Sequence, residues 1–177
     1  MNLKRNLKKI DSMWAIIKFD KKNFEFLKKN FKKKLGEDIK IYAPKIFFQK
    51  YKKNRMIVKE FNLLGDYLFC FHDKFKNPQI INSLKFTRGI KYFLNGFINS
   101  QEEINKFIKK CKDSEDQNGH LTQNFFELYT NSNYEFTSGP FTEKIFRIID
   151  LQKNKINILL GNIKIKINRK DFLFWPA

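Results

Sequence analysis

Arg88 is the residue whose type and setting most favour a chemical role in this sequence. It is one of five arginines among 36 basic side chains, and it lies between Thr87 and Gly89. Its planar guanidinium can stack on an unpaired nucleobase and hydrogen-bond the edge of that base, which a lysine ammonium does less well. A salt bridge at the edge of a strand is the alternative role for the same side chain.

Residues that could carry out acid–base or metal chemistry are present but are not grouped along the chain. Cys70 and Cys111 have 40 residues between them, and His72 and His120 have no partners at metal-ligand spacing. The sequence contains no glycine-rich phosphate loop, no Gly-x-Ser-x-Gly and no His-Glu-x-x-His. We therefore expect no metal, no cofactor and no enzymatic activity, and interpret the chain as a binding protein.

The net charge of +18 indicates an anionic partner, and its distribution is uneven. Residues 1–60 carry 19 basic and 6 acidic side chains, whereas residues 111–135 carry 1 basic and 5 acidic side chains. The predominance of lysine, asparagine and isoleucine is also what an A/T-rich genome would impose on any protein. No apolar run approaches the roughly 20 residues of a membrane span, and no secretory signal is evident, so we expect a cytoplasmic location.

The elements that must position Arg88 are predicted to form an α+β domain over residues 13–111. Residues 1–12 are expected to form a flexible basic arm. Strands are predicted at 14–19, 66–71 and 89–94, together with a hairpin between 39 and 61 that turns near 52–54. Helices are predicted after Asn23, at 78–86 and after Ser100, where apolar residues recur at helical spacing. The predicted order of elements favours a sheet with helices packed on it.

The spacing of apolar residues changes towards the C-terminus. Residues 112–124 are polar and are interpreted as a linker. Beyond them Ile156, Ile158 and Leu160 alternate with polar residues, as do Ile163, Ile165 and Ile167 after a turn at Gly161. Period two with closely spaced turns predicts a small all-β barrel over residues 125–177.

Several segments of the chain together form a recognisable pattern. In the first predicted domain these are segments 14–17, 41–44, 64–69 and 87–93, which read WAII, IYAP, LGDYLF and TRGIKYF. In the second they are Ser138-Gly139-Pro140-Phe141 and Leu159-Leu160-Gly161. Together these segments resemble the NusG family of transcription elongation factors, most of all its RfaH-like paralogues, and Gly139-Pro140-Phe141 is similar to the Gly-Pro-Phe of the family's KOW motif. The resemblance implies an NGN-type antiparallel sheet flanked by helices, a linker and an SH3-like KOW barrel.

The sequence also departs from the family pattern. The turn that is Phe-Pro-Gly-Tyr in the family is Leu64-Gly65-Asp66-Tyr67 here, and Phe146 replaces a KOW glycine, as happens in RfaH-like proteins. Ile80-Ile81-Asn82 occupies the place of the His-Thr-Thr segment with which RfaH contacts the polymerase gate loop.

Site residues and partners follow from the resemblance. It implies a surface for the clamp helices of the largest RNA polymerase subunit, made of Trp14, Ile16, Leu64, Tyr67 and Phe69. It implies contacts to the non-template DNA strand from Lys21, Lys22, Thr87 and Arg88. The KOW motif residues would be Gly139, Pro140, Phe141 and Gly161.

The function implied is transcription elongation and antitermination, by bridging the polymerase clamp and the second-largest subunit. A small-subunit ribosomal protein or Rho would be a further partner of the KOW domain. The alternative is a basic KOW-domain protein that binds RNA or associates with the ribosome. A third interpretation, an enzyme, would need a catalytic centre that the sequence does not reveal.

Overall fold

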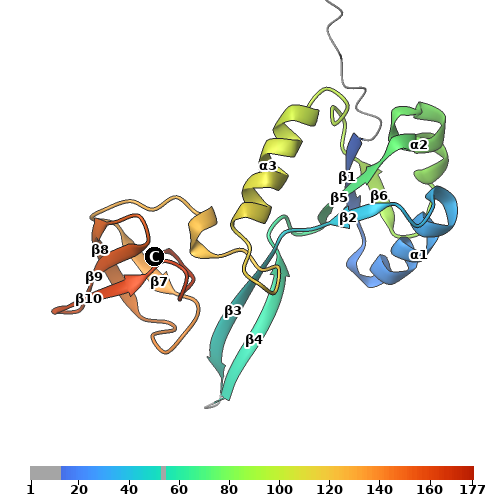
Figure 1. Ribbon diagram of the computed structural model, residues 1–177. Helices are drawn as coiled ribbons and strands as arrows, with labels where there is room; N and C mark the ends of the chain where they lie inside the picture. The colour runs from blue at the N-terminus through green and yellow to red at the C-terminus, as the bar shows by residue number, and fades with distance from the viewer. Residues whose placement is uncertain (1–12, 53–54) are drawn as a thin grey trace, which may run out of the picture. The chain divides into compact units, whose positions relative to one another are not determined.

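The computed structural model describes residues 13–52 and 55–177, which form two compact units (Figure 1). Unit 1 comprises the described residues up to Ala43 together with Asp66–Lys106. Unit 2 comprises Pro44–Gly65 together with Phe107–Ala177. The predicted basic arm and the centre of the predicted turn at 52–54 lie outside the described residues.

Unit 1 is built on a four-stranded antiparallel sheet in the order β2-β5-β1-β6. Its strands are β1 (Met13–Phe19), β2 (Lys40–Tyr42), β5 (Tyr67–His72) and β6 (Ile90–Phe93). In β1, Ala15, Ile17 and Phe19 are fully or almost fully buried, so they mark the face that supplies the core. Trp14, Ile16 and Lys18 alternate with them and therefore lie on the opposite face.

The helices of unit 1 form where apolar residues recur every three or four positions. Helix α1 (Phe24–Leu35) buries Leu27, Phe31 and Leu35, and its lysines occupy the remaining faces. The other elements are η1 (Lys21–Asn23), η2 (Asp73–Lys76), α2 (Pro78–Leu84) and α3 (Gln101–Asp113), within which the boundary between the units falls. The α+β class with antiparallel sheets is thus confirmed, and the assignment of these sheets to NGN and KOW domains stays a prediction.

Unit 2 contains a two-stranded hairpin and a five-stranded antiparallel sheet. The hairpin pairs β3 (Lys45–Lys52) with β4 (Arg55–Asn62). The larger sheet has the order β10-β9-β8-β7-β11. Its strands are β7 (Asn133–Phe136), β8 (Ile145–Leu151), β9 (Lys155–Leu160), β10 (Ile163–Asn168) and β11 (Phe174–Pro176). The alternating isoleucines of 156–167 therefore predicted β9 and β10 correctly.

Aromatic side chains dominate the core of the five-stranded sheet. The ring of Phe136 lies 4.2 Å from that of Phe146, between ring centroids, and 5.9 Å from that of Phe174. Tyr134 stacks on Phe146 at 6.1 Å, and Ile148, Ile156 and Ile158 complete the buried cluster. This core uses one face of each strand, as the period of two requires.

Residues 112–124, interpreted from the sequence as a linker, are instead largely packed into unit 2. They begin with the end of α3 and contain an isolated bridge between Glu115 and Leu121, and Leu121 is almost fully buried. Gln123 in η3 (Gln123–Phe125) is also buried, and its Oε1 accepts a hydrogen bond from the Phe174 backbone N–H at 3.0 Å. Polar residues of this segment, such as Asp116 and Thr122, form hydrogen bonds within it, so their polarity does not mark a flexible linker.

Candidate partner and nucleic-acid surfaces

Four of the five residues predicted to bind a protein partner share one face of the unit 1 sheet. Ile16 of β1 lies directly opposite Phe69 of β5, and Trp14 and Tyr67 occupy neighbouring positions of the same face. The fifth, Leu64, is half-buried and belongs to unit 2. The sheet register, rather than closeness in sequence, brings the four together.

Trp14 and Phe69 are buried and do not form an outward surface, contrary to the prediction. They are 7% and 3% exposed, and their rings meet edge to face at 6.2 Å. The indole Nε1–H of Trp14 donates to Asn105 Oδ1 at 3.1 Å, and Gln101 hydrogen-bonds both the backbone N–H and C=O of Trp14. The first turns of α3 therefore cover this end of the face, and Ile16 and Tyr67 remain half-exposed.

Two tyrosines and a lysine form a row across three strands on the exposed end of this face. Tyr67 of β5 and Tyr92 of β6 both pair in register with Lys18 of β1. The two phenolic oxygens are 2.8 Å apart, and the Lys18 ammonium lies 5.4 Å and 5.6 Å from the two ring centroids. This tyrosine row (Lys18, Tyr67, Tyr92) offers apolar rings, hydroxyl groups and a cation together, a composition typical of protein interfaces.

The tyrosine row yields a pH prediction. The hydrogen bond to Tyr92 raises the pKa of Tyr67 above its ordinary value, partial desolvation adds to this effect, and the charge of Lys18 opposes it. Because the folded pKa is raised, this interaction stabilises the fold fully below about pH 10 and is lost as the pH rises through the folded pKa. We expect Tyr92→Phe to return the pKa of Tyr67 towards its ordinary value, measured by NMR titration of the tyrosine ring carbons. An unchanged Tyr67 titration in Tyr92→Phe, with Tyr129→Phe as the matched control, would contradict the assignment.

The Thr87-Arg88-Gly89 segment forms a turn that is docked on α1. Thr87 is buried, and its hydroxyl oxygen accepts a hydrogen bond from Lys34 Nζ at 3.0 Å. Gly89 has φ +97°, where any other residue would strain the backbone, and a Cβ there would press on atoms of Asn23 and Leu27 at 3.1–3.2 Å. Thr87 and Gly89 therefore hold the turn in place, and Thr87 is not available for the nucleic-acid contact predicted for it.

Arg88 is exposed, and its guanidinium contacts Phe26 of α1 and Asn23, the residue that precedes this helix. Arg88 Nε donates to Asn23 Oδ1 at 3.0 Å, and the guanidinium carbon lies 5.3 Å from the centroid of the Phe26 ring. Neither contact is the salt bridge weighed from the sequence. These two contacts fix the position of the guanidinium on the surface.

The two predicted phosphate-binding lysines differ in their availability. Lys21 Nζ lies 3.2 Å from Asp66 Oδ1, and Lys91 Nζ lies 3.5 Å from the other oxygen of the same carboxylate. The hydrogen bond from Lys21 is the main cause that lowers the pKa of Asp66. Lys22 is exposed, and its backbone N–H donates to Asp20 Oδ1. Lys22 is therefore the better candidate of the pair for an external anion.

Two exposed aromatic residues near this turn were missed by the sequence analysis. Phe86 is 91% exposed and directly precedes the Thr-Arg-Gly segment. Phe26, whose ring lies under the Arg88 guanidinium, is 47% exposed. A phenylalanine inside a predicted helix is normally assigned to the core, so the residue type itself did not mark them as exposed. A cation–aromatic spacing between Phe86 and Arg88 was the one available hint.

The predicted KOW motif residues have structural roles in unit 2. Gly139 has φ +81°, and a Cβ there would lie 2.6 Å from the Phe172 ring. Phe141 packs on Phe136 with ring centroids 5.6 Å apart, whereas Pro140 is exposed and Gly161 occupies the β9–β10 turn with φ +59°. These residues build the sheet and its turns and do not converge on a site.

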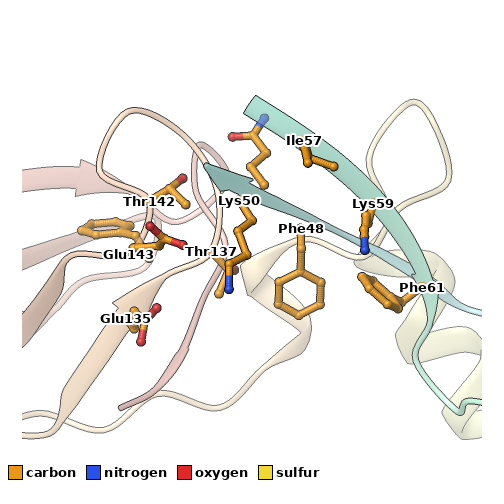
Figure 2. A pocket seen from close by; sticks show the side chains of 11 residues that line it. Phe48, Lys50, Ile57, Lys59, Phe61, Glu135, Thr137, Thr142 and Glu143 are labelled. Atoms are coloured by element: carbon orange, nitrogen blue, oxygen red, sulfur yellow. The ribbon is translucent and has the colours of Figure 1, made fainter. Parts of the chain in front are cut away.

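Unit 2 also contains an open groove of about 680 Å³ between the hairpin and β7 with its following loop. Figure 2 shows Phe48, Lys50 and Phe61 contributed by the hairpin, and Glu135 and Glu143 contributed by the other side. Because lysines and glutamates line the same groove, it does not present the uniformly positive surface that a nucleic acid prefers. The basic surface of unit 1 is therefore the better candidate for that partner.

In the described residues, no group of histidine, cysteine or acidic side chains could hold a metal ion. Nor is any described helix both long and apolar enough to cross a membrane.

Comparison with known proteins gives distant structural similarity alone. No family model and no curated protein matches the sequence. The crystal structure of the MjSpt4:Spt5 complex in conformation B has a TM-score of 0.31 and 14% identity, covering 94% of this chain and 97% of the other. A structure describing domain interaction in Thermotoga maritima NusG has a TM-score of 0.31 and 15% identity, covering 89% of this chain and 92% of the other.

Proposed function

We propose that the chain is a NusG/RfaH-like transcription elongation and antitermination factor that binds RNA polymerase without catalysing a reaction. The observation that carries the proposal is the half-exposed sheet face of unit 1, where Ile16 and the tyrosine row lie together. Strand β1 with Trp14 and the Thr-Arg-Gly segment, both of which suggested the family, lie in this same unit. The apolar and aromatic side chains of this face suit a helical partner.

The mechanism is a shift in a conformational equilibrium of the polymerase. Bound at the clamp helices, and bridging to the second-largest subunit, the factor would favour the closed clamp and so suppress pausing and termination. Its effect can be no larger than its preference for the closed over the open state. Arg88 and Lys22 would contact the exposed non-template strand at the same time, and the surface would thereby gain affinity from two linked contacts.

Unit 2 is proposed to recruit a second partner, such as a small-subunit ribosomal protein or Rho. One observation favours the alternative, direct RNA binding by this unit. Arg147 of β8 and Lys164 of β10 both pair with Leu159 of β9, and both are exposed together with Lys166. These cations could contact phosphates.

Retention of purified RNA polymerase by the immobilised full-length chain tests the leading proposal. Tyr67→Ala is expected to weaken retention about tenfold, because a half-buried aromatic in an interface commonly contributes more than 1 kcal/mol. Tyr129→Ala, which removes a tyrosine that is 62% exposed in unit 2, is the matched control and should bind as the unaltered chain does. Failure of the unaltered chain to retain polymerase, together with RNA binding that is lost in an Arg147→Ala and Lys164→Ala double variant, would support the alternative instead.

A further inference from the structure

The surface beside the Thr-Arg-Gly turn carries aromatic and cationic side chains in close succession. Phe86 is the most exposed of the large apolar side chains in the described part of the chain. Lys85 precedes it, and Arg88 follows two residues later, placed on the ring of the exposed Phe26. We call these four residues, Lys85, Phe86, Arg88 and Phe26, the Phe86 ridge.

The backbone fixes the ridge in its orientation. The N–H of Thr87 donates to Leu84 O at 2.8 Å, and that of Ile90 donates to Thr87 O at 3.0 Å, so tight turns lie on both sides of Thr87. Thr87 points inward and is anchored by Lys34, and its two neighbours in the chain are exposed. Phe86 therefore stands on a rigid support with its ring in solvent.

The charges around the ridge are mainly positive. The ridge itself contains two cations, Lys85 and Arg88, and Lys34 contacts its turn through Thr87. A fourth cation, Lys22, adjoins Asn23, the hydrogen-bond partner of Arg88. The nearby acids are already engaged. Asp20 accepts hydrogen bonds from Asn23 Nδ2 and the Lys22 backbone, and Glu25 pairs with Lys28 at 2.7 Å. The surface thus keeps a net positive charge next to an exposed ring.

We propose that the Phe86 ridge binds unpaired nucleobases of a single strand, with Phe86 as the stacking residue and Arg88 as its cationic neighbour. The inference rests on the nucleic-acid contact in the proposed function, and it changes which residue makes the base contact. Arg88 already lies against Phe26 on one side, so Phe86 offers the freely accessible aromatic face. Stacking on an aromatic ring combined with phosphate attraction is the usual way in which proteins bind single strands.

An alternative occupant, the apolar surface of a protein, fits the ridge less well. A protein anchor of this size normally enters a pocket of other apolar side chains, whereas the chain neighbours of Phe86 are Lys85, Thr87 and Arg88. A base stacked on the ring would place its phosphates within reach of the cations at 85 and 88.

Fluorescence anisotropy with the full-length chain tests the proposal, with fluorescein-labelled dT12 and U12 as probes. Phe86→Ala is expected to weaken binding about tenfold, as loss of one base–aromatic stack does, with an unchanged salt dependence because no cation is removed. Phe86→Trp should restore binding and show quenching of the new tryptophan. Because Phe86 is exposed, both variants should keep the circular dichroism and melting temperature of the unaltered chain.

The matched control is Tyr129→Ala, which removes an exposed aromatic from unit 2 and should bind both probes normally. A stronger response to dT12 or to U12 assigns the strand as DNA or RNA. Wild-type binding by Phe86→Ala, an equal loss in Tyr129→Ala, or no binding of either probe by the unaltered chain would overturn the proposal. Polymerase retention that persists in Phe86→Ala would then show that the proposed function stands without it.

Discussion

Replacing Phe136 by alanine is expected to lower the free energy of unfolding of unit 2 by about 3–5 kcal/mol. Phe136 is completely buried, and its ring contacts the rings of Phe141, Phe146, Phe172 and Phe174. Its removal leaves a cavity that four rigid rings cannot readily close. The variant therefore loses the transfer free energy of the buried ring and also bears the free-energy cost of the cavity. A small domain has only about 5–15 kcal/mol in total, so this loss would be a large share of the stability of unit 2.

Urea unfolding followed by tryptophan fluorescence measures this loss. The chain has two tryptophans, and Trp175 lies in unit 2 whereas Trp14 lies in unit 1, so a Trp14→Phe background isolates unit 2. Ile163→Ala is the matched control, because this side chain is 65% exposed and should change stability by less than about 0.5 kcal/mol. A loss below about 1 kcal/mol in Phe136→Ala would show that the aromatic cluster is not the core of this unit.

Trp14→Ala is expected to destabilise unit 1 by a comparable amount, about 3–5 kcal/mol. The indole packs on Phe69 and Phe71, with centroids 6.2 Å and 4.9 Å away, and its N–H is hydrogen-bonded to Asn105. Losing the ring empties this volume and leaves the Asn105 oxygen without its donor. Urea unfolding followed by far-ultraviolet circular dichroism measures the effect.

Tyr67→Ala separates structural from contact roles on the same sheet face. Tyr67 is half-exposed, so its loss should reduce stability much less than the loss of Trp14, while it weakens polymerase retention. The opposite pattern, with Trp14→Ala stable but defective in retention, would restore Trp14 to the partner surface predicted from the sequence.

The secondary structure of this chain is readable from local patterns. Leu27, Phe31 and Leu35 recur at helical spacing and are the buried residues of α1, and alternating isoleucines predicted β9 and β10. These signals are local because the period of an element depends on its own backbone geometry.

The candidate surfaces were less readable, because they depend on contacts between distant residues. Trp14 and Ile16 share a strand face, yet Gln101 and Asn105 cover the first and leave the second half-exposed. Likewise Thr87 and Arg88 are neighbours in the chain. Thr87 is buried and hydrogen-bonded to Lys34, whereas Arg88 is exposed and packs on the ring of Phe26. Spacing in the sequence could place such residues on an element but could not show what covers them.

The central position of β1 has a consequence for the synthesis of the protein. This strand is synthesised before both of the strands beside it, which arrive only with residues 67–72 and 90–93. Until then Ile17 and Phe19 have no completed interior to enter, and both edges of the strand lack their permanent neighbours. The nascent chain therefore exposes an apolar strand with unpaired edges until β6 has been made, and chaperones that shield this strand during that interval would raise the yield of folded protein.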